Sequence, residues 1–326
     1  MRANSPPGTG YHVAMFSYRH AFHAGNHADV LKHTVLIAIL RHLAQKDNAL
    51  AVFDTHAGAG LYRLDSDYAQ TSGEAAQGFL RLVGQTAGPP TAGGSASKAV
   101  AAAASALTPA LQDYADIVAG FNAKASFKIY PGSPFIIQRL LRGRDKLKLF
   151  ELHPTDSKTL SANIAQLEAG RQVAVLREDG FEGLKKFLPP PQRRALVLID
   201  PSYEVKSDYA RVTSAIADAL TRYATGAYVV WYPLIPRMDA HDLPRKLQSL
   251  ANKAGKRWLN PTLTVKSSKL LHDDAGQEKR PGLPASGMFI INPPHTLKAI
   301  LQSALPQMVQ LLGQDKNARF SLDGAG

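Results

Sequence analysis

The sequence predicts an α/β fold with a mostly parallel sheet, helices on both faces and a small inserted helical subdomain. Short apolar runs alternate with helical patterns, which is typical of parallel sheets whose strands are connected by helices. The first of these runs ends in a glycine-bearing loop. Roughly ninety residues then separate the first predicted strand from the second, far more than one crossover connection needs.

The first predicted element is an amphipathic helix from Ala28 to Lys46. Asn26 can cap this helix, and Asp29 suits the positive end of the helix dipole. Apolar residues recur at helical spacing at Leu31, Val35, Leu36, Ile39, Leu40 and Leu43. The pattern therefore predicts a helix that buries an apolar face.

Five short apolar runs, most of them bounded by charges, glycine or proline, predict strands. They are Ala49–Phe53, Leu147–Glu151, Gln172–Leu176, Ala195–Asp200 and Ala227–Tyr232. Helical patterns at Thr155–Leu167 and Asp208–Tyr223 separate the later runs. Two further runs, Leu259–Lys266 and Gly287–Ile291, have no clear helix between them, which predicts an antiparallel hairpin at one sheet edge.

The chain divides into one main domain with an insertion and two irregular ends. Residues 1–14 are rich in Pro, Gly and Ser. An alanine-rich stretch at 87–110 is of low complexity. We expect an extension without regular structure at 1–14, a main domain at 15–62 and 130–312, an inserted helical subdomain at 63–129, and a flexible tail at 313–326.

Composition excludes several classes of protein. The chain has no cysteine, which excludes disulfides, cysteine-ligated zinc and iron–sulfur clusters. The longest apolar run is Val35–Leu40, too short to span a bilayer, and the first fourteen residues lack the apolar stretch of a signal peptide. We therefore expect a cytoplasmic protein with no membrane partner; the oligomeric state cannot be inferred.

The charge balance favours a nucleic-acid partner. The chain has 38 basic and 26 acidic residues, a formal net charge of +12, and a pI near 9.8. Such a balance is typical of proteins that bind phosphate backbones, although many basic proteins do not. Charge alone indicates neither the nucleic acid nor the reaction.

Carboxylates and glycines follow four successive predicted strands, at the edge where open parallel sheets bind ligands. They are Asp54, Gly58, Gly60, Glu151, Asp179, Gly180 and Asp200. Glu151 can accept both ribose hydroxyls of a nucleoside cofactor, and Asp179 can accept from an adenine amine. No third glycine follows Gly60 as in a pyrophosphate-binding fingerprint, which disfavours a nicotinamide cofactor.

The segment Asp200-Pro201-Ser202-Tyr203 is the most informative tetrapeptide. An aromatic amine is a poor nucleophile because its lone pair is delocalised into the ring. The Asp200 carboxylate and the Pro201 carbonyl can accept its two hydrogens and so align the lone pair for methyl transfer. Tyr203 can stack on the base. An ordinary Asp-Pro turn after a strand is the alternative interpretation.

Two other motifs have weaker functional interpretations. His20, His23 and His27 lie close together before the first helix, but they straddle a glycine, so a loop covering the site is favoured over a metal centre. The segment 292–295, Asn-Pro-Pro-His, is similar to the tetrapeptide at 200–203, but it follows a strand expected to be antiparallel. We interpret it as structural, and we expect no metal.

Several segments together resemble the RlmJ family of bacterial adenine-N6 methyltransferases, which act on large-subunit ribosomal RNA. These segments are SYRHAFHAGNHADVLKHT, DTHAGAG, YPGSP, ELHP, EDGF and LIDPSYE. The resemblance covers most of the chain from Met15 to Pro294. It implies a class I S-adenosylmethionine-dependent methyltransferase fold, a Rossmann-like seven-stranded sheet whose last strand is antiparallel, with a small helical subdomain inserted after the first strand.

The resemblance also implies roles for individual residues. Asp200 would hold the target amine, and Tyr18 and His20 would lie in an N-terminal element that closes over the site. The pocket for S-adenosylmethionine would include Lys32, His33, His56, Ser133, Glu151, Asp179, Gly180 and Asp200. The usual family tetrapeptide is Asp-Pro-Pro-Tyr, so Ser202 is a departure that puts the stiffness of this loop in doubt.

Two alternatives remain open from the sequence. A DNA adenine methyltransferase would use the same tetrapeptide, although no separate DNA-recognition domain is evident. A non-catalytic basic RNA-binding factor would have no need for the four carboxylates Asp54, Glu151, Asp179 and Asp200. The sequence identifies neither the target adenine nor whether the substrate is naked RNA or an assembled particle.

Overall fold

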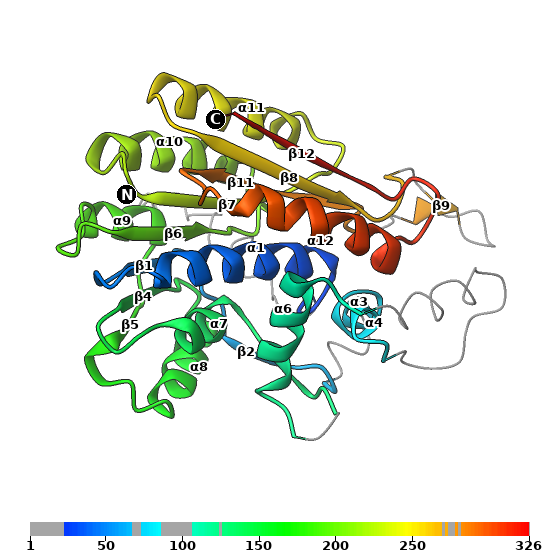
Figure 1. Cartoon of the computed structure of the whole chain (residues 1–326), viewed down its shortest axis with the longest axis horizontal. Helices are drawn as coiled ribbons and strands as arrows, with labels where there is room; N and C mark the ends of the chain where they lie inside the picture. The colour runs from blue at the N-terminus through cyan, green and yellow to red at the C-terminus, as the bar shows by residue number, and fades with distance from the viewer. Residues whose placement is uncertain are drawn as a thin grey trace, which may run out of the picture.

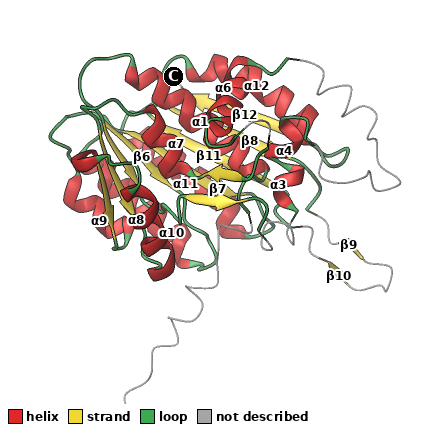
Figure 2. Cartoon of the chain, turned by 90° about the horizontal axis from the view of Figure 1, so that it is seen from below, coloured by secondary structure: helices red, strands yellow, loops and turns green. Residues whose placement is uncertain are grey.

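The computed structural model describes residues 23–66, 73–85, 106–123, 126–268, 271–272, 278–279 and 282–325. Its main sheet has eight strands in the order β12-β8-β11-β7-β6-β1-β4-β5 (Figure 1). The strands are β1 (Ala51–Asp54), β4 (Lys146–Phe150), β5 (Val173–Leu176), β6 (Ala195–Ile199), β7 (Ala227–Pro233), β8 (Trp258–Thr264), β11 (Ala285–Ile291) and β12 (Arg319–Ala325). A separate two-stranded sheet consists of β9 (Leu271–His272) and β10 (Glu278–Lys279) (Figure 2).

Strand directions confirm the predicted fold class. β5, β4, β1, β6 and β7 run parallel to one another, so their carboxyl ends lie at one edge of the sheet. β11 is antiparallel to both β7 and β8. Without β12, the sheet is therefore the predicted seven-stranded one in which the last strand along the chain is antiparallel.

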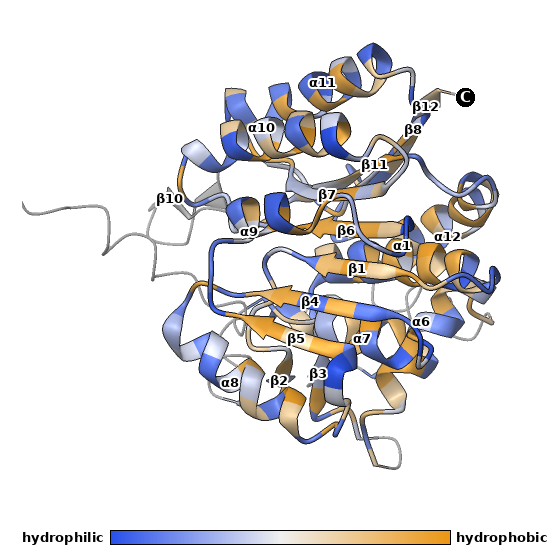
Figure 3. Cartoon of the chain, turned by 90° about the vertical axis from the view of Figure 1, so that its left-hand side faces the viewer, coloured by the Kyte–Doolittle hydropathy of each residue, from blue (hydrophilic) through white to orange (hydrophobic). Residues whose placement is uncertain are grey.

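Alternating side chains on the strands pack into two apolar clusters, one on each face of the sheet. The central strands are accordingly hydrophobic over most of their length (Figure 3). In β1, Val52 packs into one apolar cluster, whereas Ala51 and Phe53 pack into the other, as the period of two in a strand requires. The first cluster includes α1 (His27–Ala44), α6 (Pro109–Ala119), α7 (Ser133–Leu140), α8 (Pro154–Ala165) and α12 (Leu297–Leu312). The second includes α9 (Gly180–Phe187), α10 (Ser207–Arg222) and α11 (Met238–Lys253).

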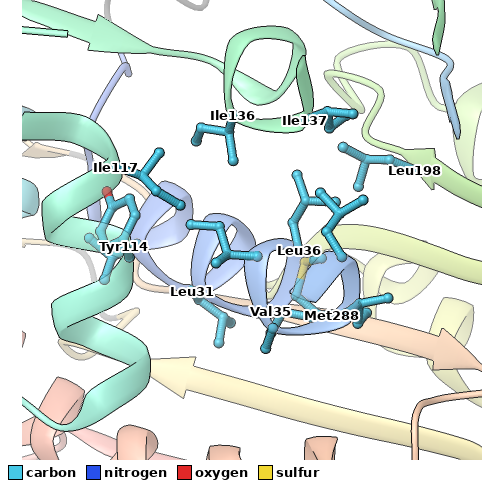
Figure 4. Packing of buried hydrophobic residues seen from close by; sticks show 14 of the residues in the cluster. Leu31, Val35, Leu36, Tyr114, Ile117, Ile136, Ile137, Leu198 and Met288 are labelled. Carbon is cyan, nitrogen blue, oxygen red and sulfur yellow. The ribbon is translucent and has the colours of Figure 1, made fainter. Parts of the chain in front are cut away.

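Helix α1 lies in the middle of the first layer. Its start agrees with the predicted cap, because the Asn26 side chain accepts from the backbone N–H of Asp29. Leu31, Val35 and Leu36 pack among residues of α6, α7, β6 and β11 (Figure 4). The helix is buried on all sides over its first fourteen residues, so the polar side chains it carries there also point into protein. Within the described ranges, no helix has the length and apolar character needed to cross a membrane.

The insertion after β1 shares the core of the main domain. It begins with β2 (Leu61–Arg63), which pairs with β3 (Ile129–Pro131), and between them lie α3 (Glu74–Gln77), α4 (Phe79–Leu82) and α6. Phe79 and Tyr114 of this segment are fully buried in the same cluster as Leu31. The predicted extension at 1–14 lies outside the described residues, as does most of the alanine-rich stretch.

Two expectations about the carboxyl-terminal part were wrong. The predicted flexible tail contains β12, which pairs with β8 over seven residues. β8 and β11 do pair antiparallel as predicted, but β12 covers β8, so their pair is not at the sheet edge. The sequence of β12 alternates charged, apolar and small residues without a continuous apolar run, which is why hydrophobic patterning alone does not indicate this strand.

Candidate active site

A cavity of about 210 Å³ lies at the carboxyl edge of the parallel strands. Residues that follow β1, β4, β5 and β6 line it, which is the place where the sheet topology directs ligands. Of the site residues predicted from the sequence, it brings together Lys32, His56, Ser133, Glu151, Asp179, Gly180, Asp200 and Pro201.

The loop after β1 forms the floor of this cavity. Gly58 has a φ of +61°, and a Cβ atom there would lie 2.4 Å from the Tyr62 hydroxyl oxygen, so only glycine fits the turn. Beneath the loop, the fully buried Asp54 accepts a hydrogen bond from the Ser133 hydroxyl at 2.6 Å. Burial raises the pKa of Asp54 to about 6, although the Ser133 hydrogen bond opposes the shift. Asp54 and Ser133 therefore join the β1 loop to α7.

Glu151 projects a carboxylate into the cavity from the end of β4. Its two oxygens accept from the backbone N–H groups of Gly58 and His153, each at 2.7 Å. Burial raises the pKa of Glu151 to about 7, even though these hydrogen bonds favour the charged form. Each oxygen retains a lone pair, so the carboxylate can still accept from the two hydroxyls of a ribose.

Asp179 and Gly180 form the start of α9. One Asp179 oxygen caps the helix by accepting from the N–H groups of Phe181 and Glu182, and the other accepts from Arg211 at 2.6 Å. The Arg211 hydrogen bond holds the pKa of Asp179 below its ordinary value against the effect of burial. A Cβ atom on Gly180 would lie 2.0 Å from the Thr55 carbonyl oxygen, so the cavity wall requires glycine there.

Arg211 is a cavity residue that the sequence did not indicate. It projects from α10, its guanidinium carbon lies 4.5 Å from the centre of the Phe181 ring, and it pairs with Asp179. His56, on the loop after β1, meets the Phe181 ring edge-on, with ring centres 4.9 Å apart. Burial lowers the pKa of His56 to about 4, so its imidazole is neutral at pH 7. Phe181 thus packs behind His56 and Arg211, which both line the cavity.

A buried chain of charges joins α1 to the end of β6. The Lys32 ammonium donates to Asp200 at 2.6 Å and lies 2.9 Å from an oxygen of Asp29. Burial alone would lower the pKa of Lys32, but the two carboxylates raise it above its ordinary value. Asp29 also accepts from the backbone N–H of Gly25 at 2.8 Å, so its role extends beyond the helix dipole. One lysine thus fixes the Asp200 carboxylate at the cavity wall.

A second cavity, of about 300 Å³, meets the first at Asp200. The two cavities share Lys32, Asp200, Ser202 and Glu204. The rest of the second lining includes aromatic and aliphatic side chains of Tyr203, Trp231, Pro233 and Ile235, together with Arg237. Asp200 therefore lies at the wall between a polar cavity and a more apolar one.

Tyr203 lines this second cavity but is only 2% exposed. Its φ of +55° turns the chain, its hydroxyl donates to the Trp231 carbonyl at 2.7 Å, and its ring is tilted against Tyr209 and Trp231. The ring is thus rigidly held, and stacking of a base on Tyr203 stays a prediction. Trp231, which the sequence did not single out, lines the same cavity.

Of the three remaining predicted site residues, only His33 is among the residues that the structure describes. His33 is buried beneath the site, with its Nδ1 atom 2.8 Å from the Tyr130 hydroxyl, and it lines neither cavity, because it is on a face of α1 that packs against the insertion. Tyr18 and His20 lie outside the described residues. Of the nearby histidines, the Nδ1 atom of His23 is 2.9 Å from Glu74, and the Nε2 atom of His27 is 3.0 Å from the Leu283 carbonyl.

The segment 292–295 has the structural role expected for it. β11 is antiparallel to β7, so this segment lies at the opposite edge of the sheet from Asp200. Asn292 has a φ of +56°, and its amide donates to the carbonyls of Ala224 and Gly226. These hydrogen bonds anchor the turn before β7.

Comparisons with known proteins identify relatives that are similar over most of this chain. A family model described as "Ribosomal RNA large subunit methyltransferase D, RlmJ" matches residues 47–322. Ribosomal RNA large subunit methyltransferase J of Escherichia coli (strain K12) is 39% identical over 292 residues, which are 90% of this chain and 92% of that protein. The protein of the same name from Haemophilus influenzae is 37% identical over 310 residues, 95% of this chain and 98% of that one.

A solved structure is similar in fold as well as sequence. The crystal structure of a protein from Legionella pneumophila has a TM-score of 0.73 and 28% identity, and the match covers 92% of this chain and 98% of that one. Sequence and fold similarity both extend over the strands and loops that form the two cavities.

Proposed function

Because the chain belongs to the RlmJ family of ribosomal RNA large subunit methyltransferases, we propose that it methylates the exocyclic N6 amine of one adenine in large-subunit ribosomal RNA. S-adenosylmethionine is the methyl donor. The observation that carries the proposal is the position of Asp200, a carboxylate at the wall common to two cavities.

The first cavity suits the nucleoside part of the donor. Glu151 presents two carboxylate oxygens for ribose hydroxyls, and the Gly58 turn lets the backbone approach a ligand closely. The rings of His56 and Phe150 line the cavity, the His56 imidazole is neutral at pH 7, and Asp179 retains acceptor capacity for an adenine amine. When bound, S-adenosylmethionine supplies a methyl group activated by a sulfonium centre.

The second cavity suits the acceptor base. Its aromatic and aliphatic lining can cover the faces of a purine, and it opens onto Asp200 and Ser202. In this arrangement Asp200 and the Pro201 carbonyl accept the two hydrogens of the target amine. The nitrogen lone pair is thereby freed from the ring and aimed toward the first cavity.

Lys32 positions Asp200 for this role. Its ammonium donates to Oδ2 of Asp200, and a carboxylate has enough lone pairs to accept from the amine as well. Methyl transfer would leave the nitrogen positively charged until it loses one proton to water. Asp200 is the carboxylate at the wall, so it stabilises this charge as it develops.

Mass spectrometry of ribosomal RNA tests the proposal directly. A strain that lacks this chain should lose one methylated adenine from the large-subunit RNA, and the purified protein should restore it with labelled S-adenosylmethionine. Transfer to DNA of similar base composition should be absent. Transfer to DNA but not to RNA, or an unchanged pattern of modified adenines in the deletion strain, would overturn the proposal.

The affinity for S-adenosylmethionine should rise with pH through about 7. The pKa of Glu151 is raised to about 7 from an ordinary value of 4.5, so the carboxylate that accepts from the ribose forms only as the pH increases. At a pH near 6 we expect binding about tenfold weaker than at a pH near 8. Titration calorimetry at a series of pH values measures this dependence.

The matched control for that experiment is Glu151→Gln. This variant should bind weakly at every pH and retain only the pH dependence of the ligand's own amino group. The difference between the two profiles isolates the Glu151 carboxyl. Profiles of equal slope for the wild type and the variant would show that Glu151 does not titrate in the binding range.

A further inference from the structure

The loop after β7 forms one side of the second cavity. Ile235 and Arg237 line the cavity, and Arg237 donates to the Tyr203 carbonyl at 3.5 Å. Helix α11 begins at the next residue, Met238. α11 therefore starts directly after a residue that lines the cavity assigned to the acceptor base and contacts the tetrapeptide at 200–203.

Met238 is unusually exposed for a large apolar residue. Its exposed fraction is 81%, against 39% for Leu152 and 40% for Phe320, the other exposed large apolar residues in the described part of the chain. Leu152 lines the first cavity, and Phe320 lies on the edge strand β12. Single exposed apolar residues are common on protein surfaces, so exposure alone carries no inference. What distinguishes Met238 is its position directly after Arg237, which lines the second cavity.

Basic residues continue from Met238 along the exposed side of α11. His241 and Arg245 follow at three and seven positions, which places them on the same helix face. Both are exposed, as is Lys246, and the Arg245 guanidinium is 3.9 Å from its ion-pair partner Asp242. Asp242, the partner of Arg245, lies four positions after Met238 on the same face, so the face presents one apolar tip beside basic and acidic side chains. Of these, Arg245 and Lys246 are exposed cations that can contact a phosphate backbone.

We propose that Met238 is a wedge that enters the base stack of the RNA at the position vacated by the target adenine. The inference rests on the proposed function. An amine on a stacked base cannot reach Asp200, so the base must be extruded, which loses its stacking and pairing. An apolar side chain inserted between the neighbouring bases restores part of the lost stacking. Methionine suits this role because it is long, unbranched and adaptable.

The test compares two RNA substrates that carry the same target adenine, once mass spectrometry has located it. One is protein-free large-subunit RNA, folded, from the strain that lacks this chain, and the other is a short single-stranded oligonucleotide. Met238→Ala should lower kcat/KM on the folded RNA by about tenfold. On the oligonucleotide, whose adenine needs no extrusion, the change should be below about twofold.

Two matched variants complete the design. Met238→Leu retains an apolar side chain of similar volume and should restore transfer to the folded RNA. Phe320→Ala also removes an exposed large apolar side chain, but far from the cavities, and should leave both substrates unaffected. The thermal midpoint should be unchanged in the two Met238 variants, because this side chain is 81% exposed.

Several outcomes would overturn the proposal that Met238 is a wedge. An equal loss on both substrates would show that Met238 contributes to general binding or folding, and no loss on either would show that it has no role. Failure of the wild type to methylate either RNA would instead refute the proposed function itself. The two failures are therefore distinguishable in one experiment.

Discussion

Replacing Asp200 by alanine is expected to reduce methyl transfer by about a hundred- to a thousandfold while S-adenosylmethionine still binds measurably. The substitution removes the carboxylate that we propose accepts from the target amine and stabilises its developing positive charge. The ligands expected for the ribose and the adenine of the donor, Glu151 and Asp179, follow other strands and keep their own partners. Lys32 remains paired with Asp29, so the fold should survive.

Single-turnover transfer of a labelled methyl group to ribosomal RNA measures this effect, and calorimetry measures donor binding in the same variant. Asp200→Asn keeps one acceptor oxygen and should fall between the wild type and the alanine variant. Asp218→Ala is the control, because Asp218 pairs with Arg222 on α10 and lines neither cavity. Near-normal transfer by Asp200→Ala would remove the catalytic assignment.

Replacing Lys32 by methionine should lower the free energy of unfolding by about 3–5 kcal/mol. The side chains of Lys32 and Asp29 are only 5% and 2% exposed, so the substitution leaves a carboxylate buried without its cation, with Asp200 nearby. Transfer activity should fall as well, because Asp200 loses the donor that positions it. Denaturant unfolding measures the stability change.

The double variant Lys32→Met/Asp29→Asn should recover part of the lost stability, because it also removes one of the stranded charges. Lys185→Met serves as the surface control. Lys185 forms an exposed ion pair with Glu182, and its loss should cost less than about 1 kcal/mol. Equal destabilisation by Lys32→Met and Lys185→Met would contradict the buried charge chain.

Most of the sheet was predictable because its parallel strands are short, apolar and buried on both faces. Each of the five predicted runs corresponds to an observed strand, with bounds that differ by a residue or two at most. The exception is β12, whose sequence has no apolar run and alternates polar and apolar residues only over Arg319–Asp323, a weak signal near the end of the sequence. Its pairing with β8 depends on tertiary context that no local pattern records.

The candidate site was predictable to the extent that the topology determines it. Residues that directly follow parallel strands must meet at one edge, and Glu151, Asp179 and Asp200 do so. Arg211 was missed because it projects from the middle of α10, where only packing decides which carboxylate it meets. His33 is a residue that was predicted for the site but lines neither cavity. It neighbours Lys32 in sequence, but consecutive helical positions face in different directions.

The pairing of Lys32 with Asp200 also has a consequence for biosynthesis. The two residues are 168 positions apart, and the helix that carries the lysine is nearly finished before the first strand has left the ribosome. Until β6 and the turn after it have been synthesised, Lys32 of α1 can pair with Asp29 but not with Asp200, and the sheet that α1 packs against is incomplete. Nascent chains therefore reach catalytic competence only late in translation, when the growing polypeptide already extends well past its midpoint.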